Sequence, residues 1–262
     1  MLLFISVNLL NKIIEMKCRS VLFFLLAVSA VACSSSKSSG SSRPISSVPS
    51  QKVNFNSKPI KSFDSIAVPN ERMAAVAAEV EDTTFVNLKD YSSDFAYDMK
   101  YATTDNFLKA KVYDCEACYL RYKTVKALLT ANAKFMKKGY RIVLYDCYRP
   151  LDIQKKMWTI VSNPDYVADP KKGSIHNRGG AVDIGLVTES GVVVDMGTPF
   201  DFFGIEARHN YEKISEEAQQ NRKLLRKVMT QNNFKIFESE WWHYNLKNSY
   251  KDKLSNFKWD CP

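Results

Sequence analysis

Residues 174–184 read SIHNRGGAVDI, and this stretch decides how the rest of the chain is interpreted. His176 lies in a polar loop that ends at Gly179-Gly180, where glycine permits a tight reversal with positive φ. Asp183 follows on an apolar strand and points to the opposite side from its two apolar neighbours. An imidazole and a carboxylate joined by such a turn are suitable ligands for one metal ion. The alternative is a loop histidine beside a surface aspartate.

A second polar cluster, ESEWWHY, occupies residues 238–244. His243 would complete a set of two histidines and one carboxylate, and catalytic zinc sites use three protein ligands and leave a fourth position for water. Glu240 is then available as a base for that water. Residues three apart face opposite sides of a flat strand, so a shared site requires the strand to begin or bend between Glu240 and His243. The alternative is a tryptophan-rich core edge with a hydrogen-bonded histidine.

Helices and short strands surround these clusters. From the spacing of apolar residues and the positions of Gly and Pro, we expect strands at 85–88, 141–145, 181–187, 234–237 and 241–244, and helices at 72–81, 120–137, 151–161 and 215–232. The apolar stripe of the second of these helices comprises Val125, Leu128, Leu129, Ala133 and Met136. Helices and hairpin-like strands do not alternate strictly, which favours an α+β fold with a central antiparallel sheet flanked by helices.

The start of the sequence predicts an export signal. Met16–Arg19 is positively charged, and Val21–Val31 is an apolar run too short for a transmembrane helix. Small residues then precede Cys33, which resembles a bacterial lipoprotein signal with lipid attached to that cysteine; a plain secretory signal is the alternative. Either reading exports the protein, and the lipid would hold it at the cell envelope, facing the periplasm. The expected organisation is a signal peptide over residues 1–32, a Ser-rich tether over 33–52 and one domain over 53–262.

Cysteine usage and net charge limit the possible partners. Four cysteines beyond the signal fit structural disulfides of an exported protein, although a metal or redox pair at Cys115 and Cys118, or free thiols, are alternatives. The other two are Cys147 and Cys261, and the sequence does not choose among the three pairings. The net charge of +9 could attract nucleic acid, but no basic and aromatic repeat supports it, so we expect no nucleic-acid partner.

The motifs together resemble a known family. Ser-x-His, six residues and Asp, followed downstream by Glu-Trp-Trp-His, is similar to the zinc D-Ala-D-Ala dipeptidases, which include the vancomycin-resistance type. Three further motifs match in order: DMKYATTDNF at 98–107, YDCYRP at 145–150 and MGTPFD at 196–201. The resemblance covers most of the chain after the tether. It implies the hedgehog/DD-peptidase-like fold of that family.

The resemblance also implies roles at the reacting centre. His176, Asp183 and His243 match the ligands of one zinc ion per chain. Glu240 matches the catalytic base, which passes the proton on to the leaving amine. Arg149 matches the arginine that stabilises the developing oxyanion, and a guanidinium suits this role because it is always charged and offers several donors.

Two further correspondences concern the substrate. Asp201 resembles the residue that holds the free ammonium of a dipeptide, and Ser174 is expected to help bind the substrate, whereas His209 is interpreted as structural. The implied reaction is hydrolysis of D-Ala-D-Ala or a related small dipeptide. The alternative is a D,D- or L,D-carboxypeptidase that acts on peptidoglycan stem peptides. A non-catalytic envelope-binding lipoprotein is disfavoured, because the ligands, the base and the arginine are all present. The oligomeric state stays open.

Overall fold

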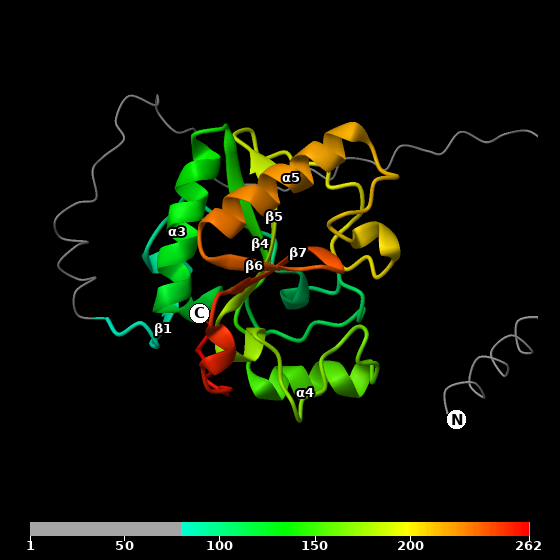
Figure 1. Cartoon of the computed structure of the whole chain (residues 1–262). Coiled ribbons are helices and arrows are strands. Elements are labelled where there is room, and N and C mark those ends of the chain that lie inside the picture. The colour runs from blue at the N-terminus through cyan, green and yellow to red at the C-terminus, as the bar shows by residue number, and fades with distance from the viewer. Residues whose placement is uncertain (1–79, 262) are drawn as a thin grey trace, which may run out of the picture. The chain divides into compact units, whose positions relative to one another are not determined.

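The structure is a computed structural model that describes residues 80–261 (Figure 1). The expected signal, the tether and all but the end of the helix expected at 72–81 lie outside the described residues. No helix within 80–261 is long and apolar enough to cross a membrane. The strands of the described part are β1 (Phe85–Asn87), β2 (Ala96–Tyr97), β3 (Tyr119–Arg121), β4 (Tyr140–Asp146), β5 (Ala181–Thr188), β6 (Phe234–Phe237) and β7 (Glu240–Leu246). Its α-helices are α3 (Tyr122–Met136), α4 (Leu151–Ile160) and α5 (Glu216–Gln231).

The main sheet has the strand order β2-β4-β5-β7-β6, and β1 pairs with β3 in a separate small sheet. The α+β prediction is confirmed. The expectation of a wholly antiparallel sheet needs one correction, because β2 runs parallel to β4 at the edge. β2 has only two residues, and so short a strand leaves no alternating pattern in the sequence.

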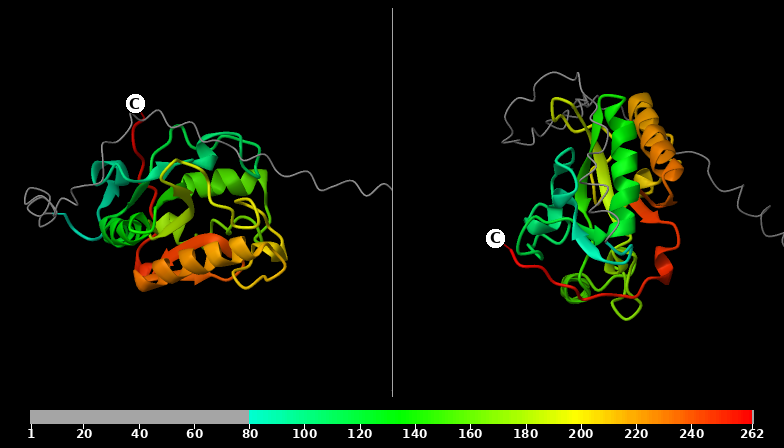
Figure 2. Two further views of the ribbon diagram at one scale, coloured as in Figure 1. Left: turned by 90° about the horizontal axis from the view of Figure 1, so that it is seen from above. Right: turned by 90° about the vertical axis from the view of Figure 1, so that its left-hand side faces the viewer.

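Helices α3 and α5 lie side by side on one face of the main sheet, as Figure 2 shows. The buried face of α3 includes Val125, Leu128 and Phe135. The predicted stripe was wrong at Ala133, which is exposed, whereas Phe135 is fully buried. Phe135 lies seven residues after Leu128, which is two helical turns, so both side chains point the same way.

Two disulfides confirm that the four cysteines are structural. Cys115 pairs with Cys261, and Cys118 pairs with Cys147. The first bond joins the end of the described chain to the segment before β3. The second joins the same segment to the residue that follows β4, at the edge of the functional site.

Residues 252–261 form a segment that we call the C-terminal strap. The N–H of Ser255 donates to the carbonyl of Asn177 (2.9 Å), and its carbonyl accepts from the N–H of Leu151 (3.2 Å). Aromatic side chains of the strap pack against the small sheet β1–β3. The strap therefore holds together the loop that contains His176 and the start of α4.

Candidate active site

Three neighbouring strands carry a row of acidic and imidazole side chains. Asp146 on β4 lies opposite Asp183 on β5, which lies opposite His243 on β7. Residues opposite each other in antiparallel strands project from the same face of a sheet. The register therefore brings together side chains that are far apart in the sequence.

His176 reaches this row from a short 3₁₀ turn before β5. Gly179 ends the turn with φ of 71°, in the left-handed region that glycine adopts most easily. A Cβ at Gly179 would lie 2.4 Å from the ring of Phe85, so any other residue would displace the turn. The reversal expected at the glycine pair is confirmed.

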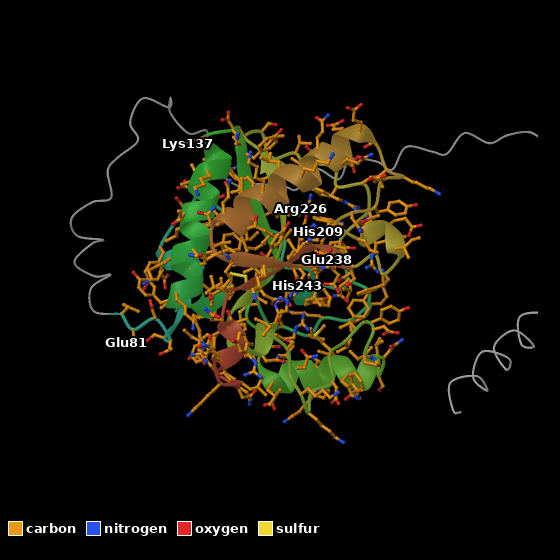
Figure 3. The ribbon with its side chains drawn as sticks, in the orientation of Figure 1. Glu81, Lys137, His209, Arg226, Glu238 and His243 are labelled. Atoms are coloured by element: carbon orange, nitrogen blue, oxygen red, sulfur yellow. A yellow bond between two sulfur atoms is a disulfide. The ribbon has the colours of Figure 1, made fainter. Side chains whose placement is uncertain are left out.

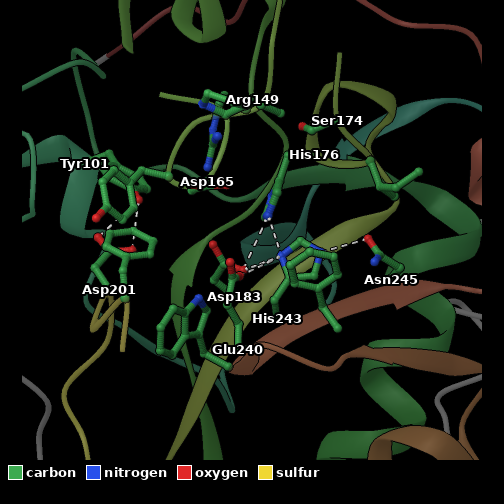
Figure 4. A pocket seen from close by; sticks show the side chains of 17 residues that line it. Tyr101, Arg149, Asp165, Ser174, His176, Asp183, Asp201, Glu240, His243 and Asn245 are labelled. Atoms are coloured by element: carbon green, nitrogen blue, oxygen red, sulfur yellow. Dashed lines mark hydrogen bonds and ion pairs between the residues drawn. The ribbon is translucent and has the colours of Figure 1, made fainter. Parts of the chain in front are cut away.

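The three predicted ligands converge on one point (Figure 4). His176 Nε2 lies 3.2 Å from His243 Nδ1 and 3.4 Å from Asp183 Oδ1, and His243 Nδ1 lies 2.9 Å from Asp183 Oδ1. Ligands of a tetrahedral zinc ion, each about 2.0–2.1 Å from the metal, are about 3.3 Å apart. The geometry and chemistry of this donor set therefore fit zinc.

The outer nitrogen of each histidine contacts a carbonyl oxygen. His176 Nδ1 lies 2.7 Å from the backbone carbonyl of Cys147, and His243 Nε2 lies 2.9 Å from Asn245 Oδ1. Such partners fix the tautomer that turns the other ring nitrogen toward a metal. Burial opposes ionisation of Asp183, but the two adjacent imidazoles hold the pKa of its carboxyl well below the usual range.

Glu240 is the first residue of β7. The pairing of β6 with β7 shifts register between Ile236 and Phe237, whose partners on β7 are Tyr244 and Glu240. β7 is therefore irregular between Glu240 and Tyr244, the stretch in which a shared site required a bend, and Glu240 Oε2 lies 3.9 Å from His243 Nδ1. Burial raises the pKa of Glu240 above its usual value, which suits a group that must accept and return a proton.

Arg149 follows β4 and is only 7% exposed. Its Nη2 lies 2.5 Å from Asp146 Oδ2, its Nε donates to the same oxygen (3.2 Å), and its Nη1 donates to Gln154 Oε1 (3.1 Å). Asp146 is fully buried and also accepts a hydrogen bond from the Tyr113 hydroxyl (2.7 Å). These contacts with Asp146 and Gln154 fix the position of the guanidinium. The arginine lines the same pocket as the ligand set.

Asp201 lies at the opposite side of the pocket from Asn245 (Figure 4). The Tyr101 hydroxyl lies 3.1 Å from each of its carboxylate oxygens. Burial, and then the charge of Asp183, raise the pKa of Asp201 well above its usual range. A carboxylate in this setting gains from a cationic partner, because burial disfavours its unpaired charge.

Aromatic side chains lie around Asp201. The Tyr101 ring lies 6.1 Å from that of Phe200, which packs 5.4 Å from Trp242, and Phe203 packs against the same tryptophan at 6.5 Å. The pocket has a volume of about 290 Å³. Tyr101, Phe203 and Trp242 line this pocket together with the Asp201 carboxylate.

Ser174 also lines the pocket. Its hydroxyl donates to Asn177 Oδ1 (3.1 Å), and the same oxygen accepts from its backbone N–H (2.7 Å). The structure thus brings every sequence-predicted site residue of the domain to one cavity, with the exception of His209, which was expected to be structural.

His209 lies between α5 and β7, and Figure 3 places it beside Arg226 and Glu238. Its ring packs edge-on against Tyr244, with centroids 5.8 Å apart, and within residues 80–261 neither ring nitrogen has a hydrogen-bond partner. Burial, and then the charges of Arg226 and Arg222, lower the pKa of His209 from 6.5 to about 4. The ring is therefore neutral at pH 7.

This burial predicts an acid-sensitive contribution to stability. Because the folded-state pKa of about 4 lies below the value of 6.5 for an unfolded chain, protonation of His209 favours unfolding. The contribution is complete above pH 6.5, and about 3 kcal/mol is lost as the pH falls toward 4. Arg222, Arg226 and His243 are the charged or titratable groups that act on this ring.

We expect the free energy of unfolding of His209→Phe to fall less than that of the wild type when the pH is lowered from 7 to 4.5. Urea unfolding of both proteins in EDTA measures this difference without interference from metal loss. The phenylalanine keeps the ring contact with Tyr244. Equal pH dependence of the two proteins would show that His209 does not titrate on unfolding.

Sequence reasoning missed several residues that hold the site together. Asp146 and Tyr101 lie inside motifs quoted for the family resemblance, but no role was assigned to either. Gln154 and Asn245 were not singled out, because a single polar side chain on a helix or strand ordinarily faces solvent. A polar residue in alternation with His243 on the same strand could have suggested Asn245.

Comparisons with known proteins agree with this arrangement. The peptidase M15 family model described as "D-ala-D-ala dipeptidase" matches residues 81–260. The chain is 33% identical over 183 residues to a D-alanyl-D-alanine dipeptidase of Escherichia coli (strain K12), covering 70% of this chain and 95% of that protein. It is 32% identical over 185 residues to one of Enterococcus faecium, covering 60% of this chain and 90% of that protein. Among solved structures, the LdcB LD-carboxypeptidase is similar with a TM-score of 0.34 and 20% identity, over 51% of this chain and 62% of that one.

Proposed function

The chain belongs to the D-Ala-D-Ala dipeptidase family of M15 peptidases, and on that premise we propose that it is a zinc dipeptidase that hydrolyses D-Ala-D-Ala. One observation carries the proposal. A pocket of about 290 Å³ contains a His-Asp-His ligand set, a mostly buried glutamate, a fixed arginine and a second carboxylate, Asp201. These groups suit the carbonyl group and the free ammonium of a small zwitterionic peptide.

His176, Asp183 and His243 would hold one zinc ion. When bound, zinc lowers the pKa of water to about 7 and polarises the carbonyl group of a substrate. Glu240 accepts the proton of the attacking water at its carboxylate. It then donates that proton to the leaving amine as the peptide bond breaks, and it returns to the carboxylate form for the next cycle.

Arg149 stabilises the negative charge that develops on the substrate's carbonyl oxygen. Three of its N–H groups are engaged by Asp146 and Gln154, and a guanidinium has further donors to offer. Because the ion pair with Asp146 fixes the plane of the guanidinium, little reorganisation is needed when charge appears on that oxygen.

Asp201 selects the free amino group of the substrate. A dipeptide that directs its carbonyl toward the metal ligands can place its ammonium beside Asp201 and Tyr101. An acylated amine has no positive charge to pair with that carboxylate. A longer peptide would therefore leave the Asp201 carboxylate buried and unpaired, which costs binding energy.

The test is the release of D-alanine by zinc-loaded protein from D-Ala-D-Ala and from N-acetyl-D-Ala-D-Ala. We expect cleavage of the free dipeptide alone, and a loss of about 10- to 100-fold in kcat/KM when Asp201→Asn removes the charge that pairs with the ammonium. Asp114→Asn, at an exposed aspartate, is the matched control. Cleavage of the acetylated peptide as fast as the free dipeptide would instead identify a carboxypeptidase of wall peptides and refute the role of Asp201.

We also propose that a lipid on Cys33 anchors the protein to a membrane of the cell envelope, facing the periplasm. The signal-like start of the sequence supports this, as do the two disulfides, because such bonds persist in oxidising compartments. Radiolabelled palmitate should be incorporated by the wild type and not by Cys33→Ala. Labelling of both proteins alike would refute the anchor.

A further inference from the structure

His243 has a polar partner on each of its two ring nitrogens. Nδ1 faces the ligand set, whereas Nε2 lies 2.9 Å from Asn245 Oδ1 (Figure 4). An amide oxygen can only accept a hydrogen bond, so Nε2 must carry the proton. The lone pair is then on Nδ1, the atom that lies 2.9 Å from Asp183 Oδ1 and 3.2 Å from His176 Nε2.

The two histidines are held in different ways. The partner of His176 is the backbone carbonyl of Cys147, which no substitution removes. The partner of His243 is a side chain and can be replaced. His176 Nδ1 also lies 3.8 Å from Asp146 Oδ2, beyond hydrogen-bond distance, whereas the hydrogen bond of His243 Nε2 depends on the side chain of Asn245.

The strand geometry explains how Asn245 reaches the ring. His243 and Asn245 are two residues apart on β7, so their side chains project from the same face. The residue opposite Asn245 on β5 is Ala181, whose methyl group is small. Asn245 also lines the pocket, next to the ligand set.

We propose that Asn245 is a positioning residue, which fixes the Nε2–H tautomer and the ring orientation of His243 and thereby sets the affinity of the site for its metal. This inference rests on the proposed zinc function. Without the amide oxygen, the ring can rotate or take the other tautomer, in which Nδ1 carries a proton and cannot bind a metal.

The experiment compares Asn245→Val, Asn245→Asp and the wild type. Zn²⁺ affinity is measured by competition with a chromogenic chelator, and the absorption bands of bound Co²⁺ report the ligand geometry. We expect Asn245→Val to bind Zn²⁺ about 10- to 100-fold more weakly and to show altered Co²⁺ bands. Asn245→Asp restores an acceptor at the same reach, so it should regain wild-type affinity and bands.

Controls separate this role from a general loss of structure. Lys247→Val changes an exposed side chain two residues after Asn245, in the turn that follows β7, and should leave Zn²⁺ affinity unchanged. Thermal unfolding in EDTA should give Asn245→Val and the wild type similar midpoints. If the valine variant does not fold, Asn245→Ser replaces it, because its shorter side chain cannot reach Nε2.

The outcomes distinguish this inference from the proposed function. A wild type that does not bind Zn²⁺ refutes the zinc function and this inference with it. A wild type that binds Zn²⁺, beside an Asn245→Val variant that binds it equally tightly with the same Co²⁺ bands, refutes the role of Asn245 alone. The same conclusion follows if Asn245→Asp binds as weakly as Asn245→Val.

Discussion

Glu240→Gln is expected to lower kcat for D-Ala-D-Ala by about 10³-fold, within the range of general acid–base catalysis. Glutamine keeps the shape of the side chain but can neither accept the proton of the attacking water nor return it to the leaving amine. Because Glu240 is not one of the three ligands, the variant should still bind one zinc ion per chain. Steady-state release of D-alanine by zinc-loaded protein measures the effect.

Glu238→Gln is the matched control, since Glu238 is exposed and lies two residues before Glu240 in the turn between β6 and β7. It should keep the wild-type rate. A zinc-loaded Glu240→Gln variant with nearly wild-type kcat would show that another group moves the proton. In that case Asp201 becomes the next carboxylate to test.

Arg149→Lys is expected to lower kcat by about 10²-fold, the loss typical for one donor to a developing oxyanion. Lysine keeps the positive charge beside Asp146, which avoids an unpaired buried carboxylate and the loss of stability that follows. It lacks the planar fork that binds Asp146 and Gln154 while presenting further N–H groups to the substrate. The variant therefore separates the effect of the positive charge from the effect of the planar arrangement of donors.

The kinetic constants show where the arginine acts. If Arg149 stabilises charge that appears only in the transition state, kcat falls and KM changes little. Arg208→Lys, at an exposed arginine, is the control. A rise in KM with unchanged kcat would mean that Arg149 binds the ground state of the substrate and does not stabilise the oxyanion.

The sequence predicted the metal ligands well for a physical reason. His176 and Asp183 lie within one turn and strand, so their proximity is local. His243 was inferred as the third ligand from the second polar cluster and from the family resemblance, and the structure explains it by the register that places His243 opposite Asp183. Glu240 joins them because β7 is irregular between Glu240 and Tyr244, and the spacing required a bend there.

Contacts between distant segments could not be predicted in the same way. The pairing of Cys118 with Cys147 depends on how β3 approaches the end of β4, which local patterns do not encode. The contact between Tyr101 and Asp201 spans about a hundred residues and depends on packing around Phe200. The Ala133 error arose because apolar spacing allows several faces of a helix, and tertiary packing chooses one.

The C-terminal strap has a consequence for the order in which the catalyst matures. Both loops that it joins are synthesised before it, so the newly made chain has the residues of the site before it has the segment that holds them. The Cys115–Cys261 bond then closes only where an oxidant is present, because reducing compartments keep thiols unpaired. Formation of this bond is thus a late step in the folding of the domain, and it requires an oxidant.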